Sequence, residues 1–147
     1  MNATRQSPLG QAMSARLVDA FPDVTRGEPA EARTLAVFRS ANASIGEIVL
    51  MDDGEELTAY VGQFTHLHFD GGGIDDDETP AAHEGRVVDE VMGWSAEVFA
   101  DRIEFFGSHE RGGGCRPRTG AARGRLSRWF FGARTWVWSG PVDPPGD

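Results

Sequence analysis

The chain has 147 residues, 39% hydrophobic and 25% charged, and this composition predicts one soluble globular domain over residues 1–147. Its formal net charge of −9 argues against nucleic acid or an anionic membrane as a partner of the whole molecule. The single cysteine excludes an intrachain disulfide, and without an apolar leader or a run of about 18 apolar residues we expect a cytoplasmic protein.

The first predicted element is an amphipathic helix that begins at Pro8. Ser7 before it is a favoured N-cap residue, and proline is favoured at the first helical position. Apolar side chains then recur at every fourth position, at Leu9, Met13, Leu17 and Phe21. Pro22 ends this helix, residues 23–33 form a polar connector, and the pattern of 34–39 fits either a strand or a short helix.

A β-hairpin is predicted next. Apolar residues 46–51 lead into an Asp-Asp-Gly turn signal at 52–54, and residues 56–69 then alternate as one long strand. Alternate residues of a strand share a face, and the better core face is Leu57, Ala59, Val61, Gln63, Thr65, Leu67 and Phe69.

The opposite face of the long strand carries aromatic and imidazole side chains. We predict it as a binding face, made of Tyr60, Phe64, His66 and His68. A sheet that is apolar on both faces must cover the second one with a helix, a partner subunit or a ligand. The first helix could cover it, and a homodimer or a binding groove is the functional alternative.

The second half of the chain predicts one further helix and shorter strands. Residues 70–79 are glycine-rich and acidic and form a loop, after which Thr79-Pro80 begins an amphipathic helix over 80–100. A short strand follows at 103–106, and the glycine- and arginine-rich residues 108–126 are predicted as a flexible loop.

The last predicted elements are a hairpin and a frayed tail. Residues 129–131 and 135–138 form the two arms around Gly132-Ala133, and residues 141–147 form the tail. Strand runs with helices between them predict an α+β fold, with an antiparallel sheet of about four to five strands and two main helices packed on one face.

The segment Thr65-His66-Leu67-His68-Phe69-Asp70 offers the most defined chemistry. In an extended strand His66 and His68 point the same way, and Asp70 can supply a carboxylate oxygen. Two imidazoles and one carboxylate suit a divalent metal such as zinc. Asp75, His83 or His109 could complete the shell of a metal-dependent hydrolase, whereas the alternative interpretation is a pair of locally bonded surface histidines.

This segment resembles, over about nine residues, the His-x-His-x-Asp-His signature of the metallo-β-lactamase-fold hydrolases. The resemblance implies metal ligation by His66, His68 and Asp70. Gly71 stands where the family has its next histidine, the family fold needs a longer chain, and the hairpin context comes too early. We therefore treat the match as coincidental.

Charge and the single thiol provide the remaining candidates. Residues 47–104 carry 16 acids and two arginines, whereas 105–134 carry one acid and seven arginines. The two parts can screen each other in the fold, or the glycine- and arginine-rich residues 111–128 can bind an anionic partner, and the sequence leaves this open. Cys115, next to Arg116, is a candidate reactive thiol or an incidental cysteine.

Taken together, these patterns favour a small acidic protein that works by binding, with no assembled active site. All 14 basic residues are arginine, which suggests a high-GC bacterial genome, and toxin-neutralising immunity proteins offer an analogy of architecture alone. We expect a protein partner or a homodimer and no resident cofactor. The alternative is a metal-dependent hydrolase that uses His66, His68 and Asp70.

Overall fold

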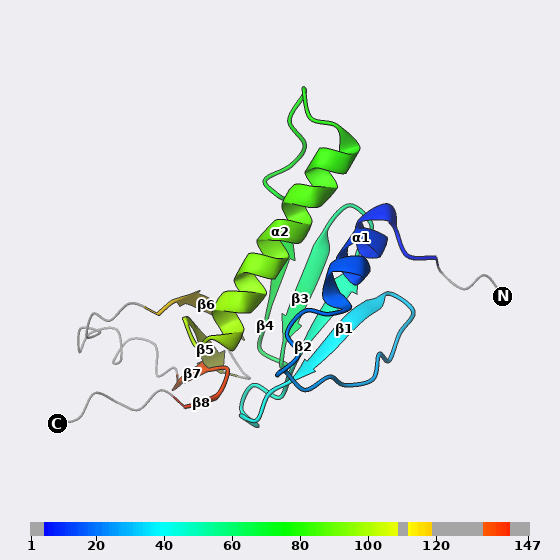
Figure 1. The fold of residues 1–147 in the computed structure, drawn as a ribbon. Helices are drawn as coiled ribbons and strands as arrows, with labels where there is room; N and C mark the ends of the chain where they lie inside the picture. Colours follow the sequence, from blue (N-terminus) through cyan, green and yellow to red (C-terminus); the bar gives the residue numbers. More distant parts are fainter. Residues whose placement is uncertain (1–4, 109–111, 119–133, 142–147) are drawn as a thin grey trace.

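Two helices and two antiparallel sheets make up the parts of the chain that the computed structural model describes, residues 5–108, 112–118 and 134–141 (Figure 1). This confirms the predicted α+β class. In chain order the elements are α1 (Pro8–Leu17), β1 (Thr34–Arg39), β2 (Glu47–Asp52), β3 (Leu57–Val61), β4 (Thr65–Phe69), α2 (Pro80–Phe99), β5 (Ile103–Ser108), β6 (Gly112–Pro117), β7 (Arg134–Val137) and β8 (Gly140–Pro141). Within those ranges, neither helix is long and apolar enough to cross a membrane.

Both helices begin where their capping residues predict. The Ser7 hydroxyl accepts a hydrogen bond from the Gly10 amide, and the Thr79 hydroxyl accepts one from the Ala82 amide. Helix α1 ends at Leu17, earlier than its apolar stripe suggests, and Phe21 beyond it takes a left-handed backbone conformation with φ of 54°.

The first sheet is a meander in the order β1-β2-β3-β4, and residues 34–39 join it as the strand β1. The prediction of a single strand over 56–69 is wrong. The chain turns back after β3, with Gly62 at a φ of 53°, and Val61 pairs with Thr65 in β4. Because directly paired residues share a face, Tyr60 and His66 still lie on the same side of the sheet.

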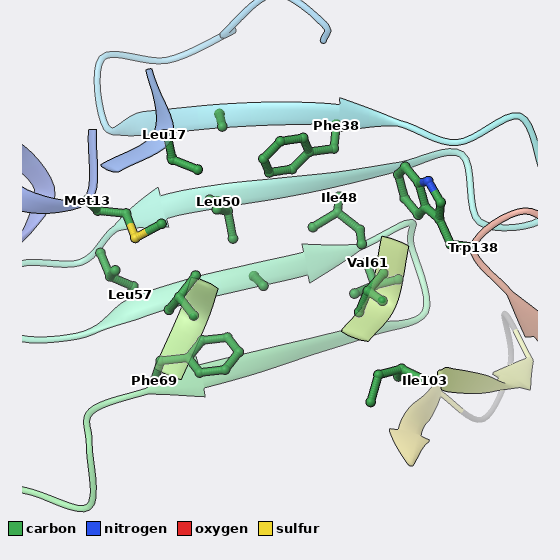
Figure 2. Close-up of a cluster of buried hydrophobic side chains, with 14 of the residues drawn as sticks. Met13, Leu17, Phe38, Ile48, Leu50, Leu57, Val61, Phe69, Ile103 and Trp138 are labelled. Atoms are coloured by element: carbon green, nitrogen blue, oxygen red, sulfur yellow. The ribbon is translucent and has the colours of Figure 1, made fainter. Parts of the chain in front are cut away.

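Both helices pack on one face of this sheet (Figure 1). Figure 2 shows core side chains from that face and from the elements that pack against it; its labelled residues are Met13, Leu17, Phe38, Ile48, Leu50, Leu57, Val61, Phe69, Ile103 and Trp138. The stripe of α2 supplies the buried residues Val87, Val88, Val91, Ser95 and Val98. Burial of these side chains is the main source of stability for the helix-to-sheet packing.

The second sheet has the order β6-β5-β7, with the two-residue β8 beside β7. It corrects the loop predicted over 108–126, because Gly112–Pro117 form a strand there. Glycine permits this pairing, since a Cβ on Gly113 would lie 2.1 Å from the carbonyl oxygen of Phe106. The rest of that predicted loop, residues 109–111 and 119–126, lies largely outside the described residues.

The structure describes only one arm of the predicted second hairpin. Residues 129–131 lie outside the described part of the chain, and so do 142–147 of the predicted tail. The other arm forms β7, which pairs with β5 and β8.

Aromatic side chains join the two sheets into one hydrophobic cluster. Phe64, in the turn between β3 and β4, lies 5.7 Å from Trp136 between ring centres and 6.4 Å from Phe105. The Ser40 hydroxyl, after β1, donates a 2.6 Å hydrogen bond to the carbonyl oxygen of Trp138. The second sheet thus closes one end of the core and leaves the histidine-bearing face of the first sheet on the other side.

Candidate functional site

The face of the first sheet opposite the helices carries three exposed side chains that lie side by side. We call Tyr60, His66 and His68 the histidine face. Tyr60 of β3 pairs directly with His66 of β4, and His68 lies two residues further along the same strand. The Tyr60 residue is 42% exposed, and both histidines are exposed as well. Three of the four residues predicted for this face therefore come together at the surface.

The rings of the histidine face are close enough to act on one bound group. The ring centres of Tyr60 and His66 are 5.7 Å apart, and those of His66 and His68 are 5.0 Å apart with the rings perpendicular. Val49 of β2 pairs with Tyr60 on the side away from His66 and is partly exposed. An aliphatic and an aromatic side chain therefore border two polar imidazoles.

A hydrogen-bond network fixes the ring of His68. Its Nδ1 lies 2.8 Å from a carboxylate oxygen of Glu56 and 3.3 Å from the Thr58 hydroxyl oxygen. Thr58 donates its own hydrogen to Asp53 at 2.5 Å, so both neighbours of Nδ1 accept. The proton of a neutral His68 therefore sits on Nδ1, and Nε2 keeps its lone pair.

This network is the part of the site that sequence reasoning missed. Asp53 and Glu56 flank the turn between β2 and β3, where the sequence pattern predicts only a turn residue and a strand residue. The pairing of Thr58 with His68 brings them beside β4. No sequence signal marks it, because residue 68 lies opposite residue 58 only after the chain has turned back at Gly62.

Phe64 does not belong to the histidine face, which corrects its predicted place among the binding residues. It lies in the turn after β3 and is 8% exposed, packed against the second sheet. The prediction was wrong because it continued the alternation of a strand through a turn.

The predicted third metal ligand, Asp70, lies beyond the end of β4. Its Oδ1 accepts a 2.8 Å hydrogen bond from the Gly72 amide, which is the local bond of a turn. Among the described residues, no three or more His, Cys, Asp or Glu side chains gather in a way that could hold a metal ion. Of the residues predicted to complete the shell, Asp75 is exposed in the 70–79 loop and His109 lies outside the described part of the chain.

His83 has a structural position on the other side of the sheet. It is on α2, is 7% exposed, and its Nε2 lies 2.7 Å from the carbonyl oxygen of Asp70, to which it donates. This bond ties the start of the 70–79 loop to the first turns of α2. His83 is therefore remote from the histidine face and unsuited to share a ligand with it.

Arg86 also fastens the 70–79 loop to α2. It forms a two-point ion pair with Glu78 and donates to the carbonyl oxygens of Gly71 and Gly73. The hydrogen bond from Arg86 lowers the pKa of Glu78, and Glu78 in turn raises the pKa of Arg86. The acidic loop is thus held by specific bonds at its two ends.

Cys115 is half-buried on β6, and burial raises the pKa of its thiol. The neighbouring Arg116 guanidinium lies 3.3 Å from Glu104 and stacks over the Phe106 ring. It is therefore engaged away from the thiol. The arrangement favours the incidental cysteine over the reactive one.

A hollow of about 510 Å³ lies between the end of α1 and the connector that follows it. Arg26 lines it and donates to the carbonyl oxygens of Leu17 and Ala20, while its guanidinium stacks over Phe38. Burial lowers the pKa of Arg26. These bonds satisfy the carbonyl group of the last residue of α1 and that of Ala20 beyond it, so the arginine has a structural role at the end of the helix.

Comparison of the chain with protein-family models, with curated proteins and with solved structures gives no match.

Proposed function

We propose that this protein works by binding a partner protein through the histidine face, without performing chemistry of its own. The observation that carries the proposal is the one-sided packing of the first sheet. Both helices lie on its core face, and Tyr60, His66 and His68 stand exposed on the other.

The composition of the face supports protein binding. Tyrosine is among the residues that contribute most at protein interfaces, because its ring buries a large area at a small cost in conformational entropy. Tyr60 is flanked by Val49 and His66, and Glu56 lies at the margin beside His68. An aromatic centre with a polar margin is the usual layout of such interfaces.

The strand pairing also supports a preformed surface. Tyr60 and His66 belong to a regular antiparallel pair, and the ring of His68 is fixed by two hydrogen-bonding neighbours. A binding surface on a sheet loses little conformational entropy when a partner docks. This favours binding to a folded protein without rearrangement of the sheet.

Photo-cross-linking in the native cell tests the proposal. A benzophenone amino acid at position 60 should give a defined adduct, and the same group at Val18, which is 76% exposed at the end of α1, should not. The cross-linked protein is then purified and its affinity for the wild-type chain measured. An adduct with a second copy of the chain identifies the homodimer form of the proposal. Equal adducts from both positions, or none from position 60, would overturn it.

A further inference from the structure

We propose that His66 and His68 form a two-histidine chelate for a divalent transition-metal ion of the zinc, copper and nickel group. The site rests on ring geometry and on the hydrogen bonds of His68, and it does not depend on the partner-binding proposal. It differs from the hydrolase site predicted from the sequence, because Asp70 takes no part in it.

The spacing of the two rings fits one shared ion. An imidazole nitrogen about 2.0–2.1 Å from zinc puts the ring centre about 3.2 Å away, so two rings about 100° apart have centres about 5 Å apart. The observed ring centres of His66 and His68 are 5.0 Å apart, with perpendicular planes. The distance between the two rings therefore allows them to share one ion.

The hydrogen bonds of His68 leave the correct nitrogen free. Its Nδ1 is bonded to Glu56 and lies near the Thr58 hydroxyl, so Nε2 carries the lone pair that a metal needs. Metal-binding histidines commonly donate their other nitrogen to a carboxylate, which fixes the ring and strengthens the ligand. Glu56 provides this carboxylate without being a ligand itself.

The two imidazole ligands also limit which metal ions can bind and leave part of the coordination sphere open. Two imidazoles and no carboxylate favour zinc, copper or nickel over magnesium and calcium, which prefer oxygen. Two protein ligands leave other coordination positions open for water or for an incoming ligand. Both histidines are exposed, so an ion can reach them without unfolding the sheet.

Isothermal titration of the purified full-length chain with ZnCl₂ tests the proposal. We expect one ion per chain, and loss of one ring, as in His66→Gln, should weaken binding about 100-fold because the second ligand binds as an intramolecular step. Glu56→Gln should weaken it about tenfold through the lost carboxylate. The control is His83→Gln, which removes the histidine that bonds the Asp70 carbonyl on the helix side of the sheet and should leave the affinity unchanged.

Histidine-selective ¹H–¹⁵N NMR of the wild-type chain gives a second readout that needs no variant. Without metal, His68 should show the tautomer protonated at Nδ1, and zinc should shift its Nε2 resonance together with one nitrogen of His66. Zinc binding that persists unchanged in the His66→Gln/His68→Gln double variant would overturn the proposal. So would the absence of these shifts at saturating zinc.

Discussion

Gly10, in the first turn of α1, is the position where the structure makes its most unusual stability prediction. An alanine in a helix is normally about 1 kcal/mol more favourable than a glycine, so Gly10→Ala should stabilise an isolated helix. In the folded protein the new Cβ would lie 2.1 Å from Oδ2 and 2.6 Å from Cγ of Asp52. No side chain tolerates such distances, so α1 or the carboxylate must shift.

That shift disturbs a buried carboxylate with three hydrogen bonds. Asp52 is 4% exposed and accepts from the Ser7 amide at 2.7 Å, the Ser7 hydroxyl at 2.6 Å and the Gly54 amide at 3.0 Å. Overpacking costs about 1–3 kcal/mol, and each hydrogen bond to a charged group contributes about 1.5–3 kcal/mol. With one of these bonds lost and the helical gain subtracted, we expect Gly10→Ala to lower the free energy of unfolding by about 1.5–5 kcal/mol.

Urea denaturation followed by tryptophan fluorescence measures this change. The matched control is Gly93→Ala on α2, where an added Cβ meets no atom within 4 Å. It should raise the free energy of unfolding by about 0.5–1 kcal/mol. The same substitution in two helices thus has opposite signs, and a Gly10→Ala variant as stable as Gly93→Ala would refute the reasoning.

Three further predictions concern single side chains. Asp52→Asn should lower the free energy of unfolding in urea by about 2–3 kcal/mol, because the NH₂ that replaces one carboxylate oxygen accepts no hydrogen bond from Ser7 or Gly54; unchanged stability would contradict this. Arg86→Ala should speed amide hydrogen exchange in the 70–79 loop and leave β1–β3 unchanged, since Arg86 bonds Glu78 and two loop carbonyls. Cys115 should react with iodoacetamide more slowly at neutral pH than in the urea-unfolded chain, because its raised pKa moves thiolate formation to higher pH; equal rates would contradict its burial.

Local signals predicted the starts of both helices and the core face of β3. Ser7-Pro8 and Thr79-Pro80 mark helix starts through chemistry that acts within four residues, and the apolar stripe of α2 is long enough to fix its buried side. The core face of β3 also follows from alternation, since Leu57 is fully buried. Each of these features depends on neighbours that are close in the sequence.

The failures of prediction depend on contacts between distant residues. Gly62 sits in a pattern that alternates on both sides, so only its backbone conformation distinguishes a turn from a continued strand. Strand β6 is glycine-rich, and glycine is depleted in strands, but here it permits the close approach of Gly113 to Phe106. The Glu56–His68 pair spans 12 residues and exists only after the chain has folded back.

Alternation in the sequence predicted Tyr60, His66 and His68 of the histidine face correctly and misplaced Phe64. The turn after β3 happens to preserve the alternation, so Tyr60 and His66 keep the side that a continuous strand would have given them. Phe64 lies within the turn itself and is buried against the second sheet. Alternation therefore placed the paired residues and failed for the one residue outside the strands.

The most direct measurement of the central proposal is the affinity of the cross-linked partner for two variants of the chain. If the histidine face is the binding surface, Tyr60→Ala should weaken binding by about 2 kcal/mol or more, which is about 30-fold. Val18→Ala, an exposed apolar substitution at the end of α1, should leave the affinity within about twofold. Equal affinities of the two variants for the partner would contradict the assignment of the histidine face as the binding surface.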